Sequence, residues 1–533
     1  MINHLFSLHK DDHLILHIAN RLSNRETILD WDGVLMGPIS DEQGLEQGGL
    51  NSSEFYKIFA KEQLTSAQKS KLGVRMKNLT VSAIGQADDT LLLSNNIYAL
   101  YSLLQLTLSF CSKHNVELSV EKLKLQAYAA SAEDLEILHN PIKVHGKTIP
   151  FSIEAEHVGI IRSTLGNTPS ILSRLSAHRN ALSAVLYTGM AKGHRANPAA
   201  SIQMNQLYGI PVLLSGLASL VLSKKEVEII DRHHSETLRK LLRLLKNTPR
   251  CVIYFLSGCL PGAALMHMRQ FSLFGMICRL SNNILNQYAF NYFSEADQFK
   301  TSWFRQIGDL CLQYNLPQPL SLLQNPLDKT AMKLLVKKKV TDYWESKLRS
   351  EAESLKSLYY FNPNFMSLRK THPLWLTTSN SPRQVSMATI QAVMLSGRYR
   401  CGALMRHWSQ KNDGVCQLSV ECREKNILED IPHLLCHCPA FIQLRLNLQN
   451  FTRSYASKLQ TEIRDLLCVK CNPQHPSFIQ FLLDCSVDSE VILLTQKYSC
   501  DILGQFFLVT RTWVFNIHRE RMKLLGRWRS LCD

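Results

Sequence analysis

Three cysteines and one histidine near the end of the chain restrict its folding more than any other feature. Five residues separate Cys416 from Cys422, ten separate Cys422 from His433, and four separate His433 from Cys438. Three thiolates and an imidazole are the ligands of a closed tetrahedral zinc site, although the first spacing exceeds the usual range of about two to four residues. Without metal, the same residues would be ordinary buried thiols. We predict a structural Zn²⁺ site, which requires all four side chains to meet.

Neighbouring residues leave the choice of ligands open. Cys436 and His437 lie between His433 and Cys438 and are rival ligands for the same ion. Segment 468–475 also contains two cysteines and a histidine, but no fourth ligand follows at a convincing spacing. We therefore predict no second zinc site there.

The cysteine usage and the apolar segments bear on the compartment. Fifteen cysteines are scattered through the chain, and its first residues do not form a secretory signal. Reduced thiols in an intracellular setting, nucleus or cytoplasm, are therefore expected. The most apolar stretch, 207–222, is shorter than a bilayer requires and contains Gly209, Pro211 and Gly216, so we predict a buried element and no membrane span.

The pattern of apolar residues predicts three regions. Residues 1–165 mix short apolar runs with glycine-rich turns, which indicates an α+β region. Helical periodicity dominates 166–330, and 331–533 lead from a basic helical stretch into the cysteine-rich region and further helices. In 236–246 the leucines share one face of a helix, which the Asn-Thr-Pro sequence at 247–249 should end.

The charge of the chain favours a polyanionic partner. Sixty lysines and arginines oppose 44 acidic residues, which gives a net charge of +16. Nucleic acid and an acidic membrane surface both fit this excess, and ordinary solvated surface explains it equally well. Motifs have to decide between them.

An aspartate pair in the first region is the strongest candidate for catalytic chemistry. Two apolar runs flank Asp88 and Asp89, which is the pattern of a β-hairpin with two carboxylates at its turn. Adjacent carboxylates repel each other, and a bound Mg²⁺ ion would offset that repulsion. Taken alone, the same sequence is more often a plain turn, because aspartate readily bonds its own backbone.

The order of the surrounding motifs resembles the reverse transcriptase of non-LTR (LINE-like) retrotransposons. Five segments match that family in sequence order: a Gln-Gly turn before a helix, the aspartate pair, a lysine-bearing segment, and two segments similar to the hairpin that closes the palm. They are 42–55, 81–94, 115–125, 144–149 and 155–160. Segment 429–439 separately resembles the Cys-Cys-His-Cys motif that follows the polymerase domain in this family.

The resemblance implies a partial polymerase palm over 1–165, a helical thumb over 166–330, and a helical C-terminal region over 331–533 with the zinc motif at 416–438. It implies RNA-directed DNA synthesis with RNA and DNA as template and primer. Asp88 and Asp89 would bind Mg²⁺, and Lys122 would lie near the triphosphate. The residues that would contact template and nucleotide are Gln47, Gly48, Gly49 and Ser52.

Two departures from the family predict an inactive chain. Active members carry an earlier strand with the first catalytic aspartate, and the alignment places Met1 just beyond it. Asp11 with Asp12 is the only nearby candidate and is better interpreted as a helix cap. Gln86 also replaces the usual aromatic residue. Since two-metal catalysis needs ligands on both sides, we expect negligible polymerase activity from this chain alone.

Basic helices suggest an alternative, a non-catalytic nucleic-acid-binding protein. In the final stretch, 511–528, basic and aromatic residues interleave as in single-strand binders, or as in an amphipathic packing helix. In the packing interpretation Trp513, Phe515 and Leu524 face inward, whereas Arg519, Lys523 and Arg527 face outward. The expected phosphate contacts of the thumb-like region are Arg174, His178, Arg179, Lys192, His194 and Arg195.

Overall fold

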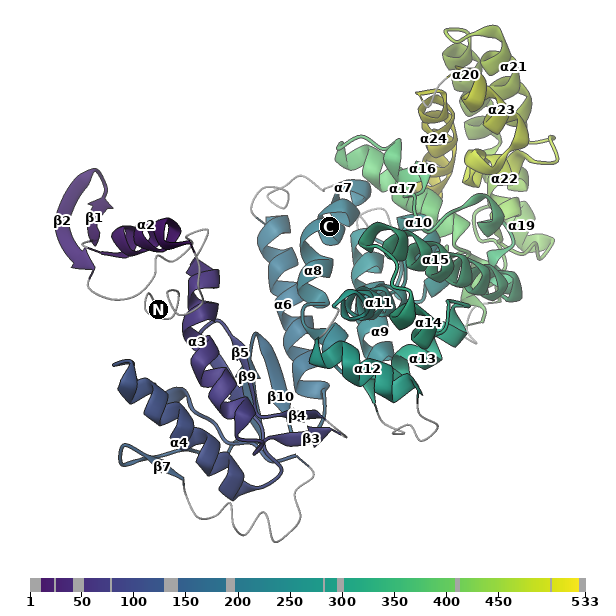
Figure 1. Ribbon diagram of the computed structural model, residues 1–533. Coiled ribbons are helices and arrows are strands. Elements are labelled where there is room, and N and C mark those ends of the chain that lie inside the picture. Colours follow the sequence, from purple (N-terminus) through teal and green to yellow (C-terminus); the bar gives the residue numbers. More distant parts are fainter. Residues whose placement is uncertain are drawn as a thin grey trace. The chain divides into compact units, whose positions relative to one another are not determined.

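The computed structural model describes residues 11–23, 25–41, 52–76, 79–128, 142–187, 197–280, 283–294, 302–407, 413–498 and 501–526. The chain divides into two compact units, shown as a ribbon in Figure 1. Unit 1 comprises Met1–Ser170 with Asn282–Asn291, and unit 2 comprises Ile171–Ser281 with Tyr292–Asp533. The first division lies close to the predicted boundary at 165, whereas the predicted regions 166–330 and 331–533 share unit 2.

Unit 1 combines helices with small antiparallel sheets, so it is α+β. Within the described residues each strand pairs only with its neighbour in sequence, which gives separate two-stranded hairpins. The strands are β1 Arg25–Trp31, β2 Val34–Asp41, β3 Val74–Met76, β4 Leu79–Val81, β5 Ala83–Gln86, β6 Asp89–Leu92, β7 Lys143–Val144, β8 Lys147–Thr148, β9 Glu154–His157 and β10 Ile160–Ser163. The helices are α2 Asp12–Leu22, α3 Ser52–Lys69, α4 Ile97–Lys113 and the short η1 Val120–Lys122.

Helices α3 and α4 form the core beneath the aspartate hairpin. Asn96 caps α4 by accepting the backbone N–H of Ala99 at 2.8 Å, which satisfies one of the free donors at the start of the helix. The buried face of α4 includes Phe110, whose ring lies 5.2 Å from that of Phe59 on α3. Helix α3 also contacts β5, so the hairpin rests on a packed helix pair.

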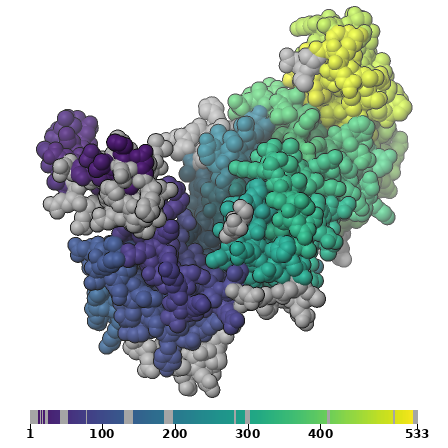
Figure 2. Space-filling model, in the orientation of Figure 1, coloured from purple at the N-terminus to yellow at the C-terminus, as the bar shows by residue number. Residues whose placement is uncertain are grey.

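Unit 2 is helical, and one of its hydrophobic core clusters joins buried residues of 202–259 to buried residues of 348–517. Figure 2 shows its residues from teal to yellow as one packed body. A shared core explains why 166–330 and 331–533 are not separate units. Its helices are α6 Thr168–Tyr187, α7 Pro198–Met204, η2 Asn205–Gly209, α8 Ile210–Leu213, η3 Leu217–Ser219, α9 Lys224–Leu241, α10 Arg250–Ser257, α11 Gly262–Arg279, α12 Ile284–Ser294, α13 Trp303–Gln313, α14 Pro319–Gln324, α15 Lys329–Ser354, η4 Lys356–Leu358, η5 Pro363–Phe365, α16 Pro373–Leu376, α17 Pro382–Leu395, α18 Gly402–Met405, α19 Val420–Glu424, η6 His433–His437, η7 Pro439–Phe441, α20 Ile442–Ala456, α21 Thr461–Lys470, α22 Phe478–Leu483, η8 Cys485–Val487, α23 Ser489–Tyr498 and α24 Asp501–Leu524. The first residues of α6 and most of α12 are assigned to unit 1.

The helix predicted over 236–246 ends earlier than expected, at Leu241. Arg243 adopts a left-handed conformation, with φ 57°. The N–H of Leu244 then donates to the carbonyl of Arg239 at 3.0 Å, and the N–H of Arg243 donates to that of Lys240 at 3.1 Å. This is the Schellman arrangement, which normally uses glycine. The prediction failed because it relied on the Pro249 signal, whereas an arginine ends the helix.

The apolar segments form helices inside the unit. No single described helix is long and apolar enough to cross a membrane, and α10 with α11 passes that test only as a pair bent by 63°. In the stretch 207–222 Leu213 and Leu217 are buried as predicted, whereas Leu207 and Tyr208 are more than half exposed. The prediction of a buried element is therefore correct for part of that stretch.

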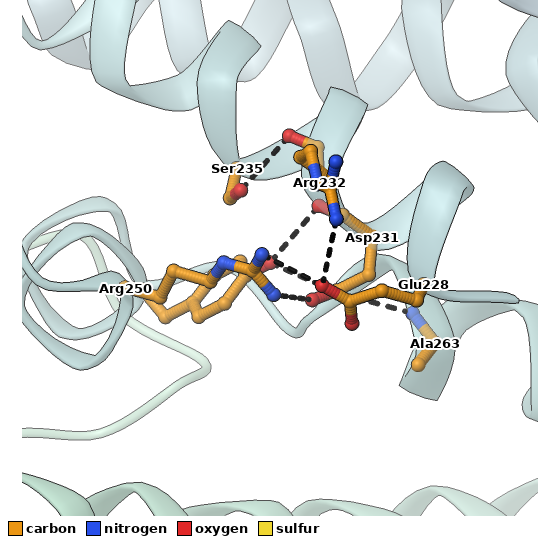
Figure 3. Close-up of polar contacts among 7 residues, drawn as sticks. Glu228, Asp231, Arg232, Ser235, Arg250 and Ala263 are labelled. Carbon is orange, nitrogen blue, oxygen red and sulfur yellow. Dashed lines mark hydrogen bonds and ion pairs between the residues drawn. The ribbon is translucent and has the colours of Figure 1, made fainter. Parts of the chain in front are cut away.

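A polar network joins three helices of this core (Figure 3). The buried carboxylate of Asp231 on α9 accepts from the Tyr254 hydroxyl at 2.9 Å and from Arg250 at 3.3 Å, both on α10. It also accepts the N–H of Ala263 at 3.4 Å and so caps α11. Glu228 binds the same Arg250 guanidinium at 2.7 Å. Burial raises the pKa of Asp231, while these donors oppose the rise.

Candidate metal centre

The first two cysteines are positioned by a small backbone loop. Val415 and Leu428 form an antiparallel bridge, and the N–H of Cys416 donates to the carbonyl of Ile427 at 2.9 Å. Between them, Cys422 lies on the short helix α19, and its carbonyl accepts from the N–H of Ile427 at 2.9 Å. These bonds fold the chain back, so that two cysteines six positions apart lie together.

The other two candidate ligands lie on one widened helical turn. Segment η6 is a π-helix, and the N–H of Cys438 donates to the carbonyl of His433 at 2.7 Å. An i→i+5 bond brings residues five positions apart onto one side of the turn. The N–H of His433 donates to Asp430 Oδ1 at 2.7 Å, which fixes the start of the turn. The π-turn thus places His433 and Cys438 side by side.

The four ligand atoms converge in a buried group. All lie within 4.8 Å of one another. The sulfurs of Cys416 and Cys438 are 3.9 Å apart, and Cys422 Sγ is 3.4 Å from His433 Nε2. Zinc bond lengths of about 2.0–2.3 Å imply ligand separations of about 3.3–3.8 Å in a tetrahedron. The three cysteines and the histidine predicted from spacing therefore form a group that could hold a metal ion.

The pKa values of the three cysteine thiols depend on the short distances between their sulfur atoms. The hydrogen bond from Cys438 lowers the pKa of Cys416 to about 5, against the effect of burial. The same hydrogen bond, followed by burial, raises the pKa of Cys438. Burial is the main cause that raises the pKa of Cys422. A divalent cation would supply positive charge that favours the thiolate form of the three cysteines.

The structure separates the rival ligands. Cys436 is half-buried and His437 is exposed, and neither belongs to the converging group. Burial raises the pKa of the Cys436 thiol to about 11, which disfavours its thiolate. Cys468 and Cys471 also lie outside any metal-ligand group in the described parts of the chain. Cys438 is thus the third sulfur of the group.

Two arginines surround the centre. Arg445 on α20 is buried, and its Nη2 donates to the carbonyl of Cys438 at 2.9 Å. Burial lowers the pKa of Arg445, and the nearby Cys438 and Cys436 sulfurs raise it. Glu429 accepts from the Gly402 N–H at 2.9 Å and from Arg521 of α24 at 2.6 Å. The ligand loop is therefore tied to the C-terminal helix by a buried ion pair.

The described part of 511–528 is a packing helix. Trp513 is buried and its indole N–H donates to Thr452 Oγ1 at 2.9 Å, while Phe515 is half-buried. Arg511 is almost fully buried, and its guanidinium donates to the Thr377 carbonyl at 3.1 Å. The inward placement of Leu524 is wrong, since it is 51% exposed near the end of the helix. Arg527 and Trp528 lie outside the described residues.

The aspartate hairpin forms as predicted, but its carboxylates are exposed. Strands β5 and β6 pair with Gln86 opposite Asp89, and Ala87 turns with φ 51°. Asp88 and Asp89 both lie on the surface at this turn. Partial burial, and then the carboxylate of Asp88, raises the pKa of the Tyr56 phenol on α3. Within the described residues, no third carboxylate, histidine or cysteine joins the pair in a metal-ligand group.

The remaining predicted residues of unit 1 are dispersed. Ser52 is the first residue of α3, and Lys122 is exposed at the end of η1. Asp11 caps α2 by accepting the N–H of His13 at 2.9 Å, as expected of a cap. The predictions on Gln47, Gly48 and Gly49 lie outside the described residues.

One predicted phosphate contact in unit 2 is wrong. His178 is fully buried, with Nδ1 at 2.9 Å from His233 Nε2 and Nε2 at 3.0 Å from Asn205 Oδ1, so phosphate cannot reach it. Arg174 is half-buried and Arg179 is exposed. The predictions on Lys192, His194 and Arg195 fall outside the described residues.

Sequence reasoning missed the residues around the metal centre and the Asp231 network. The partners in these contacts are far apart in sequence and follow no spacing rule, as in the pairs Glu429 with Arg521 and Asp231 with Tyr254. Arg445, seven positions after Cys438, and Glu429, four positions before His433, are close enough in sequence to suggest a role, but their partners are not evident from the sequence.

Searches against protein-family models and against curated proteins find no match to this chain.

Proposed function

We propose that this chain is a nucleic-acid-binding protein of the non-LTR reverse transcriptase type, with a structural zinc centre and without polymerase activity of its own. The observation that carries the proposal is the convergence of Cys416, Cys422, His433 and Cys438. A motif inferred from spacing alone could be coincidence. Convergence of its four side chains supports the view that it is a metal motif of the kind found after the polymerase domain in that family.

The ligand set favours zinc in a structural role. Three sulfurs and one nitrogen suit Zn²⁺, and calcium or magnesium would require oxygen ligands. Four protein ligands complete a tetrahedron and leave no position for substrate. The cysteine ligands are fully buried and His433 nearly so, which also suits a structural site.

The aspartate pair supports an origin in a polymerase fold and argues against activity. A hairpin with exposed Asp88 and Asp89 at its turn rests on α3, in the order expected for the resemblance. Two-metal phosphoryl transfer needs carboxylates on both sides of the ions. The described residues bring no further ligand to this pair. Binding of RNA and DNA, favoured by the charge of +16, is then the remaining role.

Three measurements on the purified full chain test the proposal. Metal analysis should find one zinc per chain, and Cys422→Ser should lose it. Labelled RNA and DNA should bind with affinity that falls steeply as salt rises. Primer extension with Mg²⁺ should give no product. Absence of binding even at about 50 mM salt would contradict the proposed partner. Extension that is lost in Asp88→Asn would contradict the lack of activity.

A further inference from the structure

We infer that the N-terminal half of α15, with Arg369 beside it, is a surface that binds the phosphate backbone of nucleic acid. This inference rests on the proposed function and assigns its binding surface. The lysine face consists of Lys329, Lys333 and Lys337, all exposed. The guanidinium of Arg369, also exposed, donates to the backbone carbonyl of Lys337 at 3.3 Å. Arg369 thereby adds a fourth cation beside Lys337.

These lysines are clustered on one helix, and within the described residues they have no acidic partner, whereas several other exposed lysines do. Lys57, Lys425 and Lys497 each contact a glutamate within 2.7 Å. Across the described ranges, no ion pair involves any member of the lysine face. Along α15 itself, no acidic residue occurs between the Asp328 cap and Asp342. Among the described residues, therefore, no ion pair compensates the positive charge of this face.

The arrangement does not serve the helix. Lys329 occupies the first helical position, where a positive charge opposes the macrodipole. Lys329, Lys333 and Lys337 follow each other at four-residue spacing, so like charges are neighbours and repel. A bound polyanion would offset the repulsion between these ammonium groups, whereas contact with water alone would leave it in place.

The face is also rigid and long enough for a nucleic-acid strand. Met332, Val336 and Val340 are buried beneath it, and Asp328 caps the helix by accepting the N–H groups of Thr330 and Ala331 at 2.7 and 3.0 Å. From Lys329 to Lys337 the helix rises about 12 Å. One strand of a duplex presents about four phosphates over that length. Preformed spacing reduces the entropy lost on binding.

The test compares two triple variants of the zinc-loaded full chain that lose the same charge. One is Lys329→Gln with Lys333→Gln and Lys337→Gln. The control replaces Lys246, Lys356 and Lys458 by glutamine, since these lysines are exposed, separate and outside any ion pair in the described structure. Affinity for a short fluorescein-labelled RNA and its DNA hybrid is measured by anisotropy from about 50 to 200 mM salt.

We expect the α15 variant to bind at least about tenfold more weakly at the higher salt, with the slope of log affinity against log salt reduced by about 2 to 3. The control should change affinity less than about twofold. A third variant that keeps the charge, Lys329→Arg with Lys333→Arg and Lys337→Arg, should bind like the original chain.

Three outcomes would contradict different parts of the inference. Equal affinity and slope in the two glutamine variants would overturn the assignment of α15 but leave the proposed function standing. Failure of the original chain to bind would overturn both. Binding of phosphatidylserine vesicles through the same lysines, without nucleic-acid binding, would overturn the choice of partner.

Discussion

The cysteine-histidine centre and the aspartate hairpin were both predicted as metal-ligand sites, and they differ in what surrounds them. The centre gathers four buried ligands from two folded segments, with Arg445 and the Glu429–Arg521 pair around it. The hairpin carries two exposed carboxylates on a two-stranded sheet. Two carboxylates that are adjacent in sequence are thus not enough to form a closed metal site. The cysteine-histidine centre differs from the aspartate hairpin because two separate segments converge in it and buried residues surround it.

The largest expected effect is removal of a ligand of the centre. Cys422→Ser or His433→Ala should lose the zinc and lower the free energy of unfolding of unit 2 by at least about 3 kcal/mol, because metal binding contributes to folding. Zinc content and thermal unfolding measure this. Cys468→Ser is the matched control, since this cysteine is exposed and outside the group. If Cys422→Ser keeps its zinc and its stability, the cysteine-histidine centre is no more a closed metal site than the aspartate hairpin, and the proposed difference between them is wrong.

Acid should weaken unit 2 through its buried histidines. Burial lowers the pKa of His234 to about 3 and of His267 and His518 to about 4. Their folded pKa lies below the unfolded value of about 6.5, so they stabilise the fold above that pH and lose this contribution as pH falls towards 4. The free energy of unfolding should fall by about 2 kcal/mol per histidine between pH 6.5 and 5.

Urea unfolding at several pH values, followed by tryptophan fluorescence, measures that loss. Replacing His267 with glutamine should flatten the pH dependence. A free energy that is constant down to pH 5 would mean that these histidines are not buried as neutral groups.

Breaking the polar network of Figure 3 should also destabilise unit 2. Arg250→Met should lower the free energy of unfolding by about 3 kcal/mol, because Asp231 is left buried without its cation. Adding Asp231→Asn should recover part of the loss, since the unpaired charge is then removed. The control Arg232→Met affects only an exposed contact of 3.9 Å and should cost less than about 0.5 kcal/mol. Equal losses in the two single variants would show that burial of the network is unimportant.

The smallest effect is expected at the hairpin. Asp88→Asn and Asp89→Asn should change the free energy of unfolding by less than about 0.5 kcal/mol, since both carboxylates are exposed. Zinc content and nucleic-acid affinity should stay the same. Isothermal titration with Mg²⁺ compares the original chain with Asp88→Asn more directly. If the original chain binds Mg²⁺ tightly and the variant does not, further ligands must lie at this turn.

The local features of this protein follow from its sequence alone. Hairpin turns, the cap at Asp11 and the candidate ligands of the centre depend on residues close in sequence, where short-range hydrogen bonding and spacing decide the outcome. The α+β character of unit 1 follows from the same local patterns. The end of α9 was misplaced because Arg243 adopts a conformation that usually signals glycine.

Tertiary packing then determines which of these features become sites. The choice of Cys438 over Cys436 depends on a π-turn and on burial, which no spacing rule encodes. The burial of His178 and the pairing of Glu429 with Arg521 depend on helices far apart in sequence. Burial and long-range pairing arise from packing of the whole unit, and packing depends on all residues together. A spacing of cysteines and histidines in the sequence can therefore suggest metal ligands, but packing of the whole unit decides whether their side chains meet.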